Sequence, residues 1–302
     1  MIHRVSLVER AFKLEDKAFR LFFHYPKVSR KNSFPYFSSD TYYYLCDKSI
    51  EHANDVDNLK NFLQVPSLYI NGNLTSNDWD QILRIFDESQ PRIQTIVIGD
   101  SDIAPDKAVL QGLKRHCDRL YSVNLRENSG EGISSIPLGL ESQRYRSAGQ
   151  LRDFRKKIHF NADNRKIGVL VAWNDSTSST ERKRARTVLA PLSITEEVKK
   201  RVTARYIHHL MKNSLFVACP RGNGLDTHRF WEALYLGSIP IIVKKDAIPA
   251  FEFGPHFAIE DWKELENLSM QDLRKLYVSK ESSLKDFCMD SRAILMAIFG
   301  SK

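Results

Sequence analysis

Cysteine is scarce in this chain of 302 residues, and no two cysteines lie close together in the sequence. The four, Cys46, Cys117, Cys219 and Cys288, form no CxxC pair, so they fit neither a disulfide framework nor a zinc site and are expected to be reduced thiols. No window approaches ~18 uninterrupted apolar residues, and charges interrupt the N-terminal segment where a signal peptide would be apolar. Glycine and proline occur in ordinary numbers, and no repeat is evident. These absences predict a cytoplasmic globular protein.

The charge is unbalanced, with a formal net value of +8. Much of the excess lies in two runs, Arg152 to Lys157 and Arg182 to Arg186, which could contact an anion or form a solvated face. Nucleic acid, acidic lipid and phosphorylated metabolites would all suit a basic protein. The sequence has no helix-turn-helix, zinc-finger or aromatic single-strand signature, so no nucleic-acid partner is expected, although a basic nucleic-acid-binding protein stays an alternative. An amphipathic first helix, from Val5 to Phe19, could lie on a membrane surface or pack on the core.

Short apolar runs alternate with amphipathic helical windows, which is typical of parallel sheets with crossover helices. The polar, basic stretch between Leu140 and Ile167 separates two such series. The predicted fold class is therefore α/β, with two Rossmann-like lobes facing an interlobe cleft. The lobes are expected at residues 1–160 and 161–302, and the last helix, Ser282 to Phe299, could pack on either lobe. Strands are expected at Ser67–Ile70, Thr95–Ile98, Leu120–Leu125, Ser135–Gly139, Ile167–Trp173, Ser214–Ala218 and Ile239–Val243, and helices at Asp78–Phe86, Asp106–Cys117, Asp226–Leu236, from about Glu181, and ending near Met211.

The stretch from Phe216 to Val243 carries the most chemical information, because its order is strand, loop, helix and strand. Gly222 and Gly224 in the loop let backbone amides approach a bound group closely. The N-terminus of the following helix offers unpaired N–H groups and a positive dipole end to an anion such as phosphate. Either Asp226 or Thr227 is the expected N-cap.

Charged side chains on this loop and helix suit a nucleotide. Arg221 and Arg229 present planar guanidinium donors that match phosphate oxygens. Glu232 follows His228 by one helical turn, so both could face the same ligand, and its carboxylate could accept hydrogen bonds from a ribose diol. Glu232 could equally pair with Arg229, and His228 could cap the helix. Gly237 is the expected C-terminal stop of the helix.

The run CPRGNGLDTHRFWEALYLGSIPIIV, from Cys219 to Val243, closely resembles the C-terminal lobe of exostosin-like glycosyltransferases. Weaker similarity extends through Phe37–Thr41, Ile98–Asp102 and Ile136–Glu141. The resemblance implies a GT-B fold in which the N-terminal lobe holds the acceptor and the C-terminal lobe the donor. It further implies inverting transfer, usually from a UDP-sugar, without an essential metal or other cofactor. The donor-binding residues expected on this basis are Asn174, Arg182, Arg221, Gly222, Asn223, Gly224, Asp226, Thr227, His228, Arg229 and Glu232.

A second part of the expected donor site is the loop from Asn174 to Arg182, after the strand that begins at Ile167. A guanidinium at Arg182 would offset the charge that builds on a departing diphosphate, as a divalent metal does in other enzymes. Asn174 and Arg182 could also belong to an ordinary turn and helix start. The motif Asp100-Ser-Asp102 is the one feature that hints at a metal, and no metal site is predicted.

Inversion requires a base that removes a proton from the acceptor hydroxyl, and a carboxylate usually does this. Asp102 and Asp40 are the first candidates, because each lies in a loop just beyond an apolar run, where sheets of this class place ligands, and Asp100 could serve instead. They could instead be turn or cap residues. The sequence thus predicts a hexosyl- or pentosyltransferase that acts on a glycan or lipid-linked acceptor in surface polysaccharide synthesis, with peripheral contact to an anionic membrane. A catalytically inactive nucleotide-binding partner is a further alternative.

Overall fold

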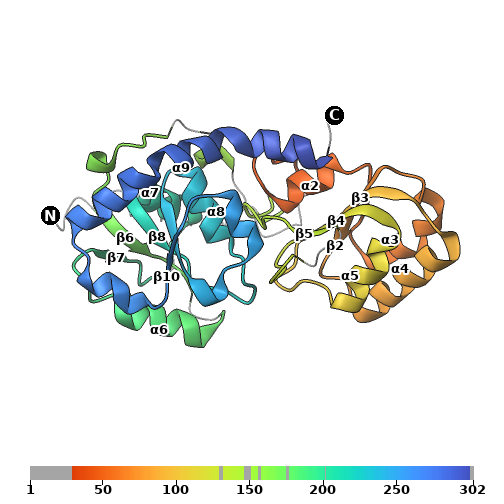
Figure 1. Ribbon diagram of the computed structural model, residues 1–302, viewed down its shortest axis with the longest axis horizontal. Coiled ribbons are helices and arrows are strands. Elements are labelled where there is room, and N and C mark those ends of the chain that lie inside the picture. The colour runs from red at the N-terminus through yellow and green to blue at the C-terminus, as the bar shows by residue number, and fades with distance from the viewer. Residues whose placement is uncertain are drawn as a thin grey trace, which may run out of the picture.

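The computed structural model describes residues 29–128, 132–145, 151–155, 158–174, 177–200 and 202–299. They form two α/β lobes side by side, each built on a parallel sheet of five strands (Figure 1). The predicted α/β class with two Rossmann-like lobes is confirmed. The amphipathic helix expected from Val5 to Phe19 lies outside the described residues.

The N-terminal sheet has its strands in sequential order, β1-β2-β3-β4-β5. Alternate side chains of β2 point to opposite faces, as strand geometry requires. Leu68 and Ile70 join a core of their own with the helices, whereas Tyr69 joins the larger core that continues into the other lobe. The elements are α2 (Ser39–Leu45), β1 (Lys48–Ile50), α3 (Ala53–Asp57), β2 (Ser67–Asn71), α4 (Ser76–Ser89), β3 (Ile93–Gly99), α5 (Lys107–Lys114), β4 (Cys117–Ser122) and β5 (Ile133–Ser135).

The C-terminal sheet has the order β10-β9-β8-β6-β7, so the first strand of this lobe, β6, lies between β7 and β8. The chain therefore adds β7 on one side of β6 and then adds β8, β9 and β10 on the other side, so the strand order reverses between β6 and β8. Ligands of open parallel sheets bind outside the carboxyl ends of strands at such a switch point. The elements are β6 (Ile167–Val171), α6 (Ser179–Leu189), β7 (Thr195–Glu197), α7 (Ala204–Lys212), β8 (Ser214–Ala218), α8 (His228–Tyr235), β9 (Ile239–Val243) and β10 (Phe257–Ile259).

The last helix, α9 (Met270–Phe299), runs along the top of Figure 1 and reaches from one lobe to the other. It packs on β6, β8 and β9, and near its end Phe299 stacks on Tyr42 of α2 with ring centroids 6.0 Å apart. The hydroxyl of Ser291 also donates a hydrogen bond to the Pro35 carbonyl oxygen, at 3.4 Å. Helix α9 thus contacts both lobes, while the division at residues 160 and 161 stays a prediction.

Each predicted strand and helix that falls within the described residues overlaps an observed one, although α9 begins earlier and β4 and β6 end earlier than expected. The strand predicted at Ser135–Gly139 was largely wrong, because β5 spans Ile133–Ser135 and shares only Ser135 with it. Three strands were not predicted: β1, β7 and β10, each three residues long and each at the edge of its sheet. A strand of three residues is too short to show the alternation of apolar and polar side chains by which a strand is recognised in a sequence. The remaining short 3₁₀ segments are Leu59–Phe62, Leu151–Asp153, Ala162–Asn164, Lys244–Asp246, Pro249–Phe253 and Trp262–Asn267.

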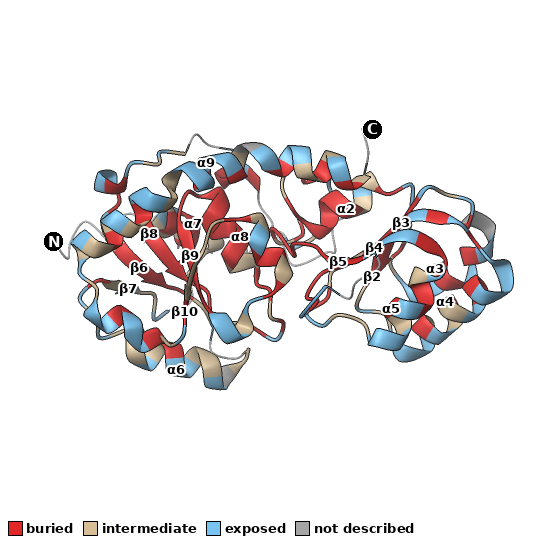
Figure 2. Cartoon of the chain, in the orientation of Figure 1, coloured by how far each residue is buried: buried red, intermediate tan, exposed pale blue. Residues whose placement is uncertain are grey.

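The buried residues are concentrated on the strands and on the inner faces of the helices, as Figure 2 shows. All four cysteines are free thiols, as predicted. Among the described helices, none has the length and apolar character needed to cross a bilayer.

Candidate functional site

A cavity of about 300 Å³ lies at the switch point of the C-terminal sheet. Trp173 and Asn174 reach it from the carboxyl end of β6, and Cys219 and Pro220 from the carboxyl end of β8. The N-terminal lobe contributes its opposite wall through Asp102, Leu138 and Glu141, so the cavity lies between the lobes. Ten of the eleven predicted donor residues line it: Asn174, Arg182, Gly222, Asn223, Gly224, Asp226, Thr227, His228, Arg229 and Glu232.

The loop and helix that form most of this wall are capped at both ends. The Thr227 hydroxyl accepts a hydrogen bond from the Arg229 amide, at 3.1 Å, so Thr227 is the N-cap of α8. Gly237 follows the helix with φ of +77°, a left-handed conformation that suits glycine, and it is the predicted stop. Gly224 fits where the loop meets the N-terminal lobe, because a Cβ there would lie 2.4 Å from the Asp102 carbonyl oxygen.

Asp226 is buried and joins the two lobes. Its Oδ2 accepts a hydrogen bond from the Leu138 amide at 2.8 Å, and its Oδ1 accepts from Trp231 Nε1 at 2.8 Å and from the Thr227 amide at 2.7 Å. The Asp226 amide in turn donates to Asn124 Oδ1 at 2.7 Å. Burial raises the pKa of Asp226 to about 6, although these hydrogen bonds oppose the rise. Because both oxygens are occupied by protein donors, Asp226 holds the cavity wall in place.

Glu232 lies in a chain of charged groups that leads away from the cavity. Its Oε2 is 3.0 Å from Arg229 Nη1, and its Oε1 is 3.6 Å from His208 Nε2. His208 is buried, and its Nδ1 lies 3.2 Å from Asp153 Oδ2 in the connection between the lobes. Burial opposes ionisation of Glu232, but Arg229 and His208 outweigh it and lower its pKa to about 2. Glu232 is therefore an ionised acceptor at the cavity wall.

His228 occupies the first turn of α8 and faces the N-terminal lobe. Its Nδ1 is 2.7 Å from the Gly139 carbonyl oxygen, which fixes the ring nitrogen as a donor, and its Nε2 is 3.4 Å from Glu141 Oε2. Burial works against protonation, but Glu141 and the Gly139 carbonyl outweigh it and raise the pKa of His228. The site thus contains an imidazole that is more readily protonated than a free one.

Arg182 is held against the glycine loop. Its Nε donates to the Arg221 carbonyl oxygen at 3.2 Å and its Nη1 to the Asn174 carbonyl oxygen at 2.8 Å, with a further contact to Thr177. A Cβ on Gly222 would lie 3.0 Å from Arg182 Nη2, so the glycine leaves room for this guanidinium. The side chain of Arg221 does not line the cavity, although the sequence predicts it as a donor contact. It lies instead close enough to Asp246 to lower that carboxyl's pKa, which burial raises overall.

The three predicted candidates for the base lie in different surroundings. Asp102 is exposed, lines the cavity and accepts a hydrogen bond from Asn223 Nδ2 at 3.2 Å. Asp40 is fully buried and receives hydrogen bonds from Arg30 at 2.9 Å, Ser142 Oγ at 2.7 Å and the Gln143 amide at 2.7 Å. Asp100 pairs with Arg30 and, at 2.5 Å, with Arg144.

Neither Asp40 nor Asp100 lines the cavity, so the structure gives them a place in an ion-pair network around Arg30. Of the three carboxylates, Asp102 alone lines the cavity.

A second hollow of about 660 Å³ adjoins the cavity and shares Trp173, Asn174 and Arg229 with it. It lies along the carboxyl ends of β6 and β7, between Ala172 and Val198. The indole N–H of Trp173 is buried without a hydrogen-bond partner in the described part of the chain.

No individual role was predicted for Glu141, His208 or Trp173 from the sequence. Glu141 ends the weakly similar segment Ile136–Glu141, which is the one sequence signal that pointed to it. His208 lies on the buried face of α7, and Trp173 ends an apolar run, so neither differs in pattern from an ordinary core residue.

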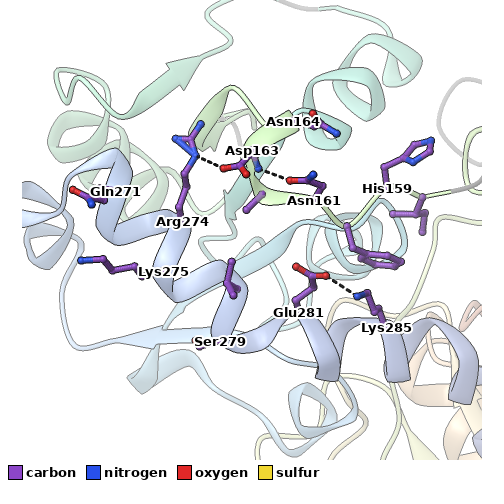
Figure 3. A pocket seen from close by; sticks show the side chains of 14 residues that line it. His159, Asn161, Asp163, Asn164, Gln271, Arg274, Lys275, Ser279, Glu281 and Lys285 are labelled. Carbon is purple, nitrogen blue, oxygen red and sulfur yellow. Dashed lines mark hydrogen bonds and ion pairs between the residues drawn. The ribbon is translucent and has the colours of Figure 1, made fainter.

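Another hollow, of about 980 Å³, lies between residues 158–164 and α9 (Figure 3). Two ion pairs lie in its lining: Arg274 with Asp163 at 3.7 Å and Lys285 with Glu281 at 2.6 Å. It adjoins the segment that leads into the amino end of β6, the opposite end from the switch point. We therefore place the candidate site at the smaller cavity.

The described residues contain no group of three or more His, Cys, Asp or Glu side chains arranged to hold a metal ion. Comparison with models of known families gave no match, and comparison with curated proteins gave none either. Among solved structures, the chain is similar to an alpha-glucosyltransferase in complex with UDP and a 13-mer DNA containing a HMU base. The identity is 10%, the TM-score is 0.37, and the alignment covers 81% of this chain and 79% of the other.

Proposed function

We propose that this chain is a glycosyltransferase that binds a nucleotide-sugar in the switch-point cavity. The observation that carries the proposal is the arrangement of the cavity wall. Arg182, His228 and Arg229 bring basic side chains to it, Glu232 adds an ionised carboxylate, and Asp102 faces them from the other lobe. The basic side chains suit a diphosphate, and the carboxylate of Glu232 suits the hydroxyl groups of a sugar or ribose. The transfer reaction requires a base, and Asp102 can supply it.

The chemistry of these groups supports one orientation of the donor in the cavity. The diphosphate lies beside Arg182, Arg229 and the N-terminus of α8, where guanidinium forks and helix N–H groups converge. The ribose diol donates hydrogen bonds to Glu232. The nucleobase enters the adjoining hollow of about 660 Å³, which Trp173 and Asn174 line together with the cavity. The choice of uridine as the nucleoside rests on the sequence resemblance.

In the transfer step, the acceptor oxygen forms a bond to the anomeric carbon while the bond from that carbon to the diphosphate oxygen breaks. The electron pair of the broken bond leaves with the nucleoside diphosphate, whose added charge is offset by Arg182 and by protonated His228. The carboxylate of Asp102 takes the proton of the acceptor hydroxyl. Because Asp102 lies on the lobe opposite the phosphate-binding loop, attack from that side inverts the anomeric configuration.

The wider role follows from the sequence resemblance. A hexosyl- or pentosyltransferase of this type would act on a glycan or lipid-linked acceptor in surface polysaccharide synthesis, in the cytoplasm at the inner face of an anionic membrane. Arg182 in the diphosphate position supplies the charge that a bound metal supplies elsewhere, and we propose that no metal is required.

The direct test is a thermal-shift screen with UDP, GDP, CMP and their sugars, because a ligand that binds only the folded state raises the melting temperature. We expect stabilisation by UDP and UDP-sugars, weakened in Glu232→Gln and preserved in Glu266→Gln, an exposed glutamate outside the cavity. Absence of a shift with every nucleotide would refute the proposal. Stabilisation without hydrolysis or transfer of any donor would instead identify an inactive nucleotide-binding protein.

A further inference from the structure

A groove of about 930 Å³ opens on the N-terminal lobe directly beside the donor cavity. The two share Asp102, Asn223 and Gly224, so the groove begins at the carboxylate that we propose as the base. An acceptor hydroxyl that reaches Asp102 must belong to a molecule whose remainder lies in the adjoining space. The groove is large enough for a small oligosaccharide, since ligand sites span roughly 300–1,000 Å³.

The lining of the groove combines an apolar floor with an excess of positive charge. Its apolar part is formed by Leu110, Leu125, Ile133 and Leu225, with Ile103 72% exposed at the edge. Its cationic side chains are Lys107, Lys114, Arg115 and Arg126, against two carboxylates, Asp102 and Glu127.

Two of the four cations are already engaged. Lys114 Nζ donates to the Cys117 carbonyl oxygen at 3.0 Å, and Arg115 Nη2 is 3.1 Å from Asp87 Oδ1, outside the groove. Lys107 and Arg126 are exposed, and neither side chain has a direct ion pair or hydrogen bond to another described residue. Arg126 lies near enough to Asp246 to favour the ionised form of that carboxyl, but no direct contact holds its guanidinium. Both cations can therefore turn toward a ligand in the groove.

Lys107 and Arg126 line a concavity with apolar walls, and walls of low dielectric concentrate the field of such charges. Asp102 itself lies among them, so an acceptor that carries a negative group beside its reactive hydroxyl would complement the groove. The apolar floor would contact the carbon face of its sugar ring.

We infer that the acceptor is anionic, with a phosphate or carboxylate group that Lys107 and Arg126 bind next to the sugar that receives the transferred residue. This inference rests on the proposed glycosyltransferase function. The same chemistry could come from a lipid-linked sugar diphosphate or from a uronic acid in a growing glycan.

The test uses the full chain saturated with UDP and measures binding by saturation-transfer NMR and competition. The probes are p-nitrophenyl β-D-glucuronide, the neutral p-nitrophenyl β-D-glucoside, and citronellyl-diphosphate-linked glucose. We expect at least one anionic probe to bind about tenfold more tightly than the glucoside. The glucuronide alone would indicate a uronic acid, and the diphosphate alone a lipid-linked sugar.

The variant Lys107→Glu/Arg126→Glu should abolish the preference for the anionic probe. Arg92→Glu, an exposed arginine at the start of β3 and outside the groove, should retain it. Equal binding of charged and neutral probes, or a preference that survives the double charge reversal, would overturn the inference. Failure to bind UDP in a separate titration would count against the proposed function instead, because the groove variants do not touch the donor cavity.

Discussion

Asp226 Oδ2 accepts a hydrogen bond from the backbone amide of Leu138 at 2.8 Å, although the two residues are 88 positions apart. The first belongs to the loop before α8 and the second to the segment after β5. This bond fixes the loop before α8 against the N-terminal lobe. Contacts within the protein therefore help to set the width of the cavity between the lobes.

Replacement of Asp226 by alanine should destabilise the fold. It leaves three buried donors, the Leu138 and Thr227 amides and the Trp231 indole, without their acceptor. An unsatisfied buried group costs about 1–3 kcal/mol, so we expect the free energy of unfolding to fall by at least about 2 kcal/mol. Urea denaturation measures this loss. Asp286→Ala, at an exposed position of α9, should change it little, and equal stability of the two variants would contradict the account.

Gly224→Ala should impair turnover more than nucleotide binding. Its Cβ would lie 2.4 Å from the Asp102 carbonyl oxygen and 2.7 Å from Asn124 Oδ1, so the loop and the proposed base must move apart. A misplacement of ~1 Å near the reacting groups can cost on the order of a hundredfold. We expect kcat for transfer or donor hydrolysis to fall at least about tenfold, with the Kd for UDP within a few-fold. An unchanged kcat would show that neither Asp102 nor the loop that contains Gly224 takes part in the reaction.

Two arginines on α6 offer a matched comparison for diphosphate binding. Arg182 lines the cavity, whereas Arg184 pairs with Asp261 on the surface. Loss of a charge-assisted contact is worth about 1.4 kcal/mol or more, so Arg182→Ala should raise the Kd for UDP at least about tenfold. Arg184→Ala should leave it within about twofold. Similar values for the two variants, measured by calorimetry, would show that Arg182 does not contact the diphosphate.

His228 should make UDP binding depend on pH. The pKa of His228 is raised against the opposing effect of burial, with Glu141, the Gly139 carbonyl, Glu232 and Asp226 favouring the protonated ring. Its positive charge attracts the diphosphate while the ring is protonated, and this attraction is lost as pH rises through that pKa.

The comparison with His228→Gln isolates the effect, because titration of UDP itself affects both proteins equally. We expect the ratio of Kd for the variant to Kd for the wild type to be large at acidic pH and to approach one at alkaline pH. A ratio independent of pH would contradict a role for the imidazolium.

The ionised Glu232 should stabilise the fold in a pH-dependent manner. Its pKa in the folded chain is about 2, below the ordinary value of 4.5, because Arg229 and His208 outweigh burial. The stability that this charge contributes is therefore present above pH 4.5 and is lost as pH falls toward 2. The difference in free energy of unfolding between the wild type and Glu232→Gln should shrink over that window. A constant difference would mean that the carboxylate is not held by these partners.

The C-terminal half of the site could be predicted from the sequence because its signals are local. A capping threonine, a glycine stop and apolar runs on both sides define β8, α8 and β9 within a few residues. The edge strands β1, β7 and β10 have three residues each and depend on pairing with a distant neighbour, which no local pattern reveals.

The roles of individual charged residues depended on tertiary contacts. Asp40 follows an apolar run just as Asp102 does, yet its carboxylate accepts hydrogen bonds from Arg30 and Ser142 and is not available to an acceptor. Arg221 is adjacent to Gly222, yet Arg182, from a helix about 40 residues earlier, lies against that glycine. Such partners are far apart in the chain, so only the folded structure identifies them.

A nucleotide is expected to bind at the switch point between β6 and β8, and calorimetric titration of UDP measures that binding without an assay of transfer. The wild type should bind one UDP per chain, and the double variant Arg182→Ala/Glu232→Ala should lose that binding at the same concentrations while it remains folded by circular dichroism. No heat of binding with the wild type, or an unchanged Kd in the folded double variant, would contradict the account.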